Sequence, residues 1–142
     1  MKFPILFLFG AFVYGALEVI FKQGDTHVSM FLLGGLCFLL LGAMSPRMSL
    51  LSRMTAGALL ITALELAVGV IVNVILNLGV WDYSYMPFNF MGQICLLFTG
   101  FWFGLSLVGF LLDGWLKHRL FNAEKPQYRI MPRLPIKRKE IA

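Results

Sequence analysis

Residues 55–80, TAGALLITALELAVGVIVNVILNLGV, form a long apolar stretch with a single charged residue, Glu65. A transmembrane helix needs about 20 consecutive apolar residues, so this stretch predicts a membrane-spanning helix that is long enough to be tilted. A carboxylate in the hydrocarbon region is costly, and it usually faces a protein interior or a water-filled cavity. We therefore expect Glu65 to be buried among facing helices, where it would mark a functional site.

Three further apolar stretches predict transmembrane helices at residues 3–21, 28–44 and 93–112. The chain is 59% hydrophobic and only 13% charged, whereas soluble domains are about 25% charged. We therefore expect an all-α membrane protein in which residues 1–112 form one bundle of four transmembrane helices. Residues 113–142 are expected to form a basic cytoplasmic tail, where several prolines argue against a long helix.

The positive charges indicate the orientation. Lys2, Arg47, Arg53 and the tail would lie on one side of a four-helix path, and only Lys22 on the other. Cytoplasmic segments carry an excess of Lys and Arg, so both termini are expected in the cytoplasm of a multi-pass protein of the bacterial inner membrane. The eight basic residues of the tail are Lys117, Arg119, Lys125, Arg129, Arg133, Lys137, Arg138 and Lys139.

The basic tail is expected to attract anionic lipid of the bilayer. Nucleic acid is not expected as a partner, because the basic run has no folded domain to present it.

The third predicted helix carries a polar face, because Glu65, Gly69, Asn73 and Asn77 follow one another at four-residue spacing. Two interpretations stay open. Polar side chains and glycine on one helix face are typical of a hydrogen-bonded seam between helices. A carboxylate on the same face would equally suit the wall of a path for a substrate or an ion, with Glu65, Asn73 and Asn77 as lining residues.

A second intramembrane carboxylate, Glu18, lies near the outer end of the first predicted helix. It could pair with Lys22, four residues later, or reach water. Alternatively, Glu18 and Glu65 could surround a shared cavity, which would suit proton-coupled transport or the binding of a cationic solute. Asp113 is expected at the inner membrane interface, where it would be either solvated or paired with Lys117, four residues later.

The outer loop, residues 81–92 with the sequence WDYSYMPFNFMG, is the most distinctive part of the chain. Its turn-forming residues predict either an aromatic turn at the membrane interface or a segment that folds back between the helices. Asp82 and Asn89 are the candidates for shaping the outer mouth of a path. Further candidate residues of this loop and its continuation are Trp81, Tyr83, Ser84 and Gln93.

The stretch from residue 81 to 96 resembles a bacterial family of small membrane proteins labelled ABC-transporter permease, type IV (CmpB-like). The resemblance covers about residues 60–107 and depends on Trp81, Asp82, Tyr83, Ser84, Phe88, Asn89, Gly92, Ile94, Cys95 and Leu96. In the first half, residues 22–27 replace the Gly-Pro-rich turn that this family would have after its early glutamate helix. The resemblance implies membrane transport without naming a substrate.

Several classes of site are not expected. The chain has no G-x-x-x-x-G-K-[ST] motif, so an ATPase would have to be a separate chain. His27 and His118 are predicted on opposite sides of the bilayer, and Cys37 and Cys95 have no metal-binding spacing, so neither a catalytic site nor a metal or cofactor site is expected.

We therefore expect a small permease or permease subunit that works in a homo-oligomer or a larger membrane complex. The alternative is a non-transporting membrane module that binds or stabilises a partner complex.

Overall fold

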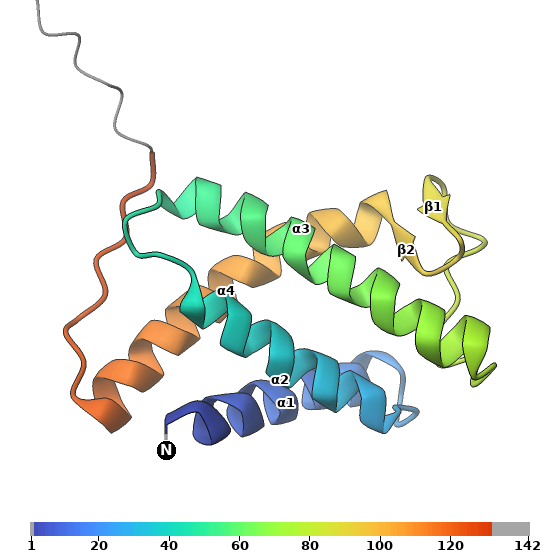
Figure 1. Cartoon of the computed structure of the whole chain (residues 1–142), viewed down its shortest axis with the longest axis horizontal. Helices are drawn as coiled ribbons and strands as arrows, with labels where there is room; N and C mark the ends of the chain where they lie inside the picture. Colours follow the sequence, from blue (N-terminus) through green and yellow to red (C-terminus); the bar gives the residue numbers. More distant parts are fainter. Residues whose placement is uncertain (1, 132–142) are drawn as a thin grey trace, which may run out of the picture.

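The structure, a computed structural model, describes residues 2–131 and is mostly helical (Figure 1). A two-stranded antiparallel sheet lies in the outer loop, with Asn89 opposite Cys95. The elements in chain order are α1 (Lys2–Phe21), α2 (Val28–Ala43), α3 (Leu50–Gly69), the π-helix η1 (Val70–Ile75), β1 (Asn89–Phe90), β2 (Ile94–Cys95) and α4 (Leu96–Phe121).

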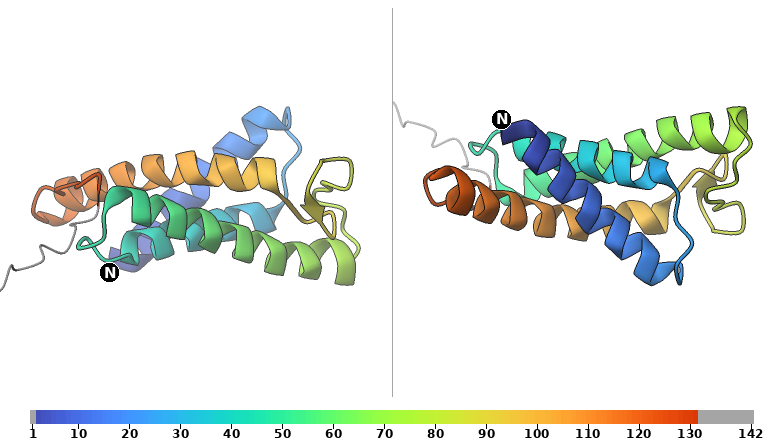
Figure 2. Two further views of the ribbon diagram at one scale, coloured as in Figure 1. Left: turned by 90° about the horizontal axis from the view of Figure 1, so that it is seen from above. Right: turned by 90° about the horizontal axis from the view of Figure 1, so that it is seen from below.

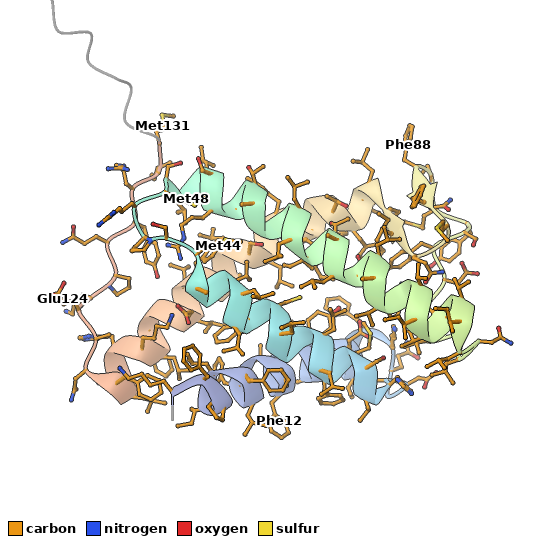
Figure 3. The ribbon with its side chains drawn as sticks, viewed as in Figure 1. Phe12, Met44, Met48, Phe88, Glu124 and Met131 are labelled. Carbon is orange, nitrogen blue, oxygen red and sulfur yellow. The ribbon has the colours of Figure 1, made fainter. Side chains whose placement is uncertain are left out.

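Within residues 2–131, three helices are long and apolar enough to cross a membrane: α1, α3 together with η1, and α4. α2 has 16 residues and a length of about 24 Å, less than the ~30 Å of a hydrocarbon core. Large apolar side chains project from the bundle as lipid-facing side chains would. Phe12 of α1 is 66% exposed and points outward in Figure 3. These features fit the predicted helical membrane class.

The third helix begins and ends earlier than predicted. Its first residue is Leu50 rather than Thr55, because the side chain of Ser49 accepts a hydrogen bond from the amide of Ser52 and caps the helix start. It ends at Ile75 rather than at Val80. Asn77 has a left-handed φ of 51°, a conformation that asparagine tolerates and that a helix cannot continue through.

The fourth helix begins at Leu96 rather than Gln93, because the preceding residues pair in the small sheet. It continues to Phe121, nine residues beyond the predicted end at 112, because the first proline of the tail, Pro126, comes only after the helix has ended. Asn122 then caps the helix with a φ of 49°. Residues 113–121, predicted as tail, are therefore part of the bundle.

The bundle consists of two helix pairs, α1 with α2 and α3 with α4 (Figures 1 and 2). In the first pair the Cα of Gly34 faces the Tyr14 ring and that of Gly10 faces Phe38. α2 also contacts α3 and α4 and joins the pairs. The main core lies where α2 meets α3 and α4. It consists of Leu33, Cys37, Leu41, Met54, Ala58, Ile61, Trp102 and Phe110.

The chain segments group at two ends of the bundle (Figure 1). The N-terminus, the turn before α3 and residues 122–131 lie at one end, which we call the inner end. The turn after α1 and the segment 76–95 lie at the other, the outer end. Residues 122–131 return to the start of α3, where the carbonyl oxygens of Arg129 and Ile130 accept from the amides of Leu50 and Leu51. These amides would otherwise lack partners, so the segment caps the helix.

Part of the predicted basic tail lies outside the described residues, namely Arg133, Lys137, Arg138 and Lys139.

Candidate functional site

Glu65 lies in the middle of the bundle and is only 1% exposed. Its oxygen Oε1 accepts a hydrogen bond of 3.0 Å from the hydroxyl of Tyr83 in the outer loop. Its oxygen Oε2 accepts one of 2.9 Å from the indole nitrogen of Trp102 on α4. The predicted burial of Glu65 among protein elements is confirmed.

No basic side chain pairs with Glu65 within residues 2–131. The two ion pairs of these residues join Lys22 to Glu18 and Lys117 to Asp113. A buried carboxylate loses several kcal/mol of hydration, and two donated hydrogen bonds offset only part of that loss. A carboxylate has about four acceptor positions, so Glu65 keeps unused capacity for a further donor.

A groove of about 90 Å³ lies beside Glu65, between α1 and α4. We call it the α1–α4 groove. Among the described residues that line it, Glu65 is the only charged one, and the other lining side chains are apolar or aromatic, with Tyr14 contributed by α1 and Trp102 by α4. The rings of Tyr14 and Trp102 are 6.2 Å apart between centroids. The site is therefore a carboxylate with two aromatic rings at the side of an apolar groove.

The ends of the outer loop dock on the bundle, whereas most of residues 84–91 are exposed, so the loop has features of both predicted arrangements. Trp81 is buried, and its indole donates to the carbonyl oxygen of Gln93, at 2.9 Å. The amide of Asn73 in η1 donates to the side chain of Gln93, at 2.8 Å, and its oxygen accepts from the amide of Val80, at 2.7 Å. Asn73 therefore anchors both ends of the loop rather than facing an open path.

The surface residues of the loop hold its shape through hydrogen bonds among themselves. Asp82 accepts from the hydroxyl and the amide of Ser84, and these bonds hold the pKa of Asp82 below its usual range. Asn89 donates to the carbonyl oxygen of Met86 and accepts from the amide of Gly92. Phe88 points away from the helices at the loop tip (Figure 3).

The fold of the loop positions the side chain of Tyr83 against Glu65. The amide of Tyr83 donates to the carbonyl oxygen of Gly92, at 2.7 Å. Its ring stacks on Phe98 of α4, with centroids 4.7 Å apart. Gly92 has a φ of 67°, and a Cβ there would lie 2.5 Å from the hydroxyl of Ser84, so only glycine suits this turn. The distinctive loop sequence thus encodes a cap that sets one hydroxyl group on the buried carboxylate.

The loop docks on α3 at Gly69, which has no side chain. A Cβ on Gly69 would lie 2.6 Å from Oε1 of Gln93 and 2.9 Å from the ring of Trp81. Both contacts are closer than packed atoms allow, so a larger residue must displace the loop.

We expect Gly69→Val to loosen the loop and to speed thiol labelling of Cys95, which is 2% exposed, by about tenfold, the effect of a ~1.4 kcal/mol loss in local stability. Labelling would be measured in a Cys37→Ala background. The matched control is Gly104→Val on α4, where nothing lies within 4 Å of an added Cβ. Equal labelling rates in the two variants would contradict the docking role of Gly69.

Glu18 lies outside the groove lining and pairs with Lys22, at 2.9 Å. Lys22 also donates to the carbonyl oxygen of Val80 in the outer loop. Of the alternatives left open for Glu18, the structure shows the pair with Lys22, and Glu18 does not share the α1–α4 groove with Glu65. Tyr14 lines the groove together with Glu65, and its hydroxyl donates to Glu18 over 3.4 Å.

The structure brings together some of the predicted residues and separates others. Tyr83 contacts Glu65, and Asn73 contacts Gln93 in a separate hydrogen bond, whereas Asn77 is exposed beyond the helix end. Sequence reasoning missed Tyr14 and Trp102 as site residues. The position of Tyr14, four residues before Glu18, was the available signal, whereas nothing local linked Trp102 to Glu65.

A polar contact between α3 and α4 supports the seam interpretation. The hydroxyl groups of Thr62 and Thr99 are 3.1 Å apart, and Thr99 also donates to the carbonyl oxygen of Cys95. Asp113 is buried near the inner end and pairs with Lys117, at 2.8 Å, so of its two expected states the paired one is present. Within residues 2–131, no three His, Cys, Asp or Glu residues come together in a group that could hold a metal ion.

No curated protein and no solved structure matches the chain. A family match nevertheless extends over nearly its whole length, well beyond the part in which the loop motif was recognised. Residues 4–131 match the family described as "Putative ABC-transporter type IV", and the chain therefore belongs to this family.

Proposed function

We propose that the chain is a small integral-membrane permease, or a subunit of one, that moves a small solute or ion past Glu65. The observation that carries the proposal is the placement of this carboxylate. It is 1% exposed, has no cationic partner among the described residues, and keeps free acceptor capacity beside the α1–α4 groove. A bilayer protein retains such a group at a cost, so it is a functional site by default.

In this proposal, Tyr83 is the group that moves away from Glu65 during transport. It belongs to a loop, whereas Trp102 belongs to a helix. Loss of the Tyr83 bond would release one oxygen of Glu65 and open it toward the outer end. Glu18, Asn73 and Asn77 would act around this path, with the salt-bridged Glu18 reached through Tyr14 and Asn77 at the outer surface. Asp82 and Asn89 would act by shaping the loop.

In the proposed topology, all four helices cross the bacterial inner membrane and both termini are cytoplasmic. The grouping of the N-terminus, the turn before α3 and residues 122–131 at one end of the bundle supports this topology. The basic residues also concentrate at that end. α2 would span with local thinning of the bilayer or with support from its neighbours.

A working path would need more than one chain. The α1–α4 groove, at about 90 Å³, is too small to form a continuous passage across a bilayer. A homo-oligomer or a larger membrane complex would complete it, and a separate chain would supply any ATPase. We propose no catalytic role and no cofactor for this chain.

The tail would contact anionic lipid. Each basic residue near the membrane surface contributes about 1 kcal/mol, which salt screens. A peptide of residues 122–142 should bind anionic vesicles at low salt and lose binding at high salt; binding that salt leaves unchanged would count against the lipid role.

The test of the permease function is flux in proteoliposomes that contain the purified chain with any co-purifying partners. An internal pH-sensitive dye reports the entry of protons or of a permeant amine. Flux above that of empty vesicles, with strong dependence on the charge of Glu65, would support the proposal. Absence of flux under proton and cation gradients would contradict it.

One observation favours the alternative of a non-transporting membrane module. Both oxygens of Glu65 already have a hydrogen-bond partner, and the Thr62–Thr99 contact lies on the same helix pair, as in a structural seam. Pull-down from native membranes separates the two functions. A stoichiometric partner that is retained with Glu65→Gln, in the absence of flux, would establish the module.

A further inference from the structure

The α1–α4 groove is long, narrow and apolar, with its charge at one end. Its wall on α4 runs from Trp102 to Leu112, a distance of about 15 Å. Trp102 and Glu65 lie at the outer end of the groove, and Leu112 lies at the inner end. A volume of about 90 Å³ corresponds to roughly six to nine water-sized positions. Spread over this length, they correspond to a groove about one to two water-sized positions wide.

The groove opens sideways. At the inner end α1 and α4 meet, because Leu6 packs in one cluster with Leu116 and the ammonium of Lys2 lies 5.4 Å from the centroid of the Phe121 ring. Toward the outer end the two helices diverge (Figure 1). Tyr83 of the outer loop covers Glu65 from the outer side. The remaining opening lies between the two helices, where a bilayer presents acyl chains.

We propose that this groove binds a single-chain cationic amphiphile that enters from the lipid phase. The ammonium head would lie at Glu65 and the alkyl tail would extend along the groove toward Leu112. This inference rests on the proposed function and names its substrate class.

The chemistry of the outer end selects a cation. Glu65 has acceptor positions beyond those used by Tyr83 and Trp102. The rings of Tyr14 and Trp102 beside it offer π faces that attract an ammonium group. An anionic head would be repelled by the carboxylate. A neutral alcohol would donate one hydrogen bond but would gain no charge attraction.

The width of the groove selects a single alkyl chain. A helix is about 10 Å across with its side chains, so a helix of a second copy or of a partner would not enter a groove of about 90 Å³. When an alkyl tail moves from the acyl chains of the bilayer into the groove, it exchanges one apolar environment for another and gains little free energy. Differences in affinity between ligands therefore arise at the head group. The groove should therefore discriminate by head-group charge.

The test uses the whole chain labelled with 5-fluorotryptophan in nanodiscs of zwitterionic lipid. The ¹⁹F resonance of Trp102 would be assigned with Trp102→Phe. Dodecylamine should shift this resonance saturably, while Trp115, which is 53% exposed on α4, should not respond. Dodecanol and dodecanoate should produce no saturable shift of Trp102. Glu65→Gln should weaken the apparent affinity for dodecylamine by about tenfold or more.

A second variant tests the position of the tail. Val108 lines the groove and is 47% exposed, so Val108→Phe should fold and should obstruct the groove, lowering the affinity by about tenfold. Leu111→Phe is the matched control, because Leu111 is equally exposed on α4 but does not line the groove. The control should bind dodecylamine normally.

Equal responses to the amine, the alcohol and the acid would overturn the proposal, as would full amine affinity in both Glu65→Gln and Val108→Phe. The resonance reports binding without transport, so the two proposals can fail separately. Charge-dependent flux without amine binding would contradict only the proposed substrate class. Amine binding without any flux would support the proposed ligand of the groove and contradict the permease function.

Discussion

Glu65→Gln should reduce flux through reconstituted proteoliposomes by about 100-fold while the chain stays folded. The size follows from the loss of a charged acceptor, since a hydrogen bond to a charged group contributes up to about 3 kcal/mol. Glutamine has nearly the same shape. Its carbonyl oxygen can accept from Trp102, and its amide can donate to the hydroxyl of Tyr83, which is able to accept as well as donate. The substitution therefore removes the charge and keeps the contacts.

The matched control for this substitution is Asp113→Asn. Asp113 is also buried, with 5% exposure, but it lies near the inner end and is paired with Lys117. Flux would be measured with the pH-sensitive dye and normalised to the amount of folded protein. The control should retain flux within about threefold, because its carboxylate is outside the α1–α4 groove. Similar losses in both variants would show that the effect is not specific to Glu65.

Trp102→Phe should destabilise the chain by about 3 kcal/mol. The indole N–H is one of two donors to a buried carboxylate, and its removal leaves Oε2 of Glu65 without a partner. The smaller ring also leaves a void in the core, where Trp102 is 7% exposed. Unfolding would be followed by the reaction of a thiol-specific dye with Cys37 and Cys95, which are both buried.

A double-mutant cycle isolates the hydrogen bond from the void. In a Glu65→Leu background there is no carboxylate to leave unsatisfied, so Trp102→Phe should cost only about 1 kcal/mol, the contribution of the lost packing. The difference, about 2 kcal/mol, measures the coupling of the two side chains. Equal costs in the two backgrounds would mean that the indole N–H does not stabilise Glu65.

The alternative functions depend on the same two bonds in different ways. In a structural seam, the role of Glu65 would be to accept hydrogen bonds from Tyr83 and Trp102. Substitution of Glu65 would then chiefly lower the stability of the fold. In a permease, the two donors would position the Glu65 carboxylate to bind a transported group. The conservative substitution Glu65→Gln would then chiefly lower flux. Stability and flux measured on the same variant therefore distinguish the two functions more sharply than either alone.

The sequence alone determined the class of protein and the burial of Glu65. Long apolar stretches require a membrane or a large core, and a carboxylate among them must face protein. It also offered the pairs Glu18–Lys22 and Asp113–Lys117 as alternatives, because a separation of four residues places two side chains together on a helix. These conclusions depend only on composition and on local helix geometry, and both are readable without knowledge of the fold.

Tertiary structure alone decided what satisfies the carboxylate. Tyr83 and Trp102 reach it from 18 and 37 residues away, and their positions depend on how the outer loop docks on Gly69 and how α4 packs on α3. It also decided that Asn73 anchors the loop while Asn77 lies outside the helix, because α3 changes to a π-helix that ends at Ile75. Helical periodicity predicts faces only while the helix continues, and contacts across elements depend on packing that no local pattern encodes.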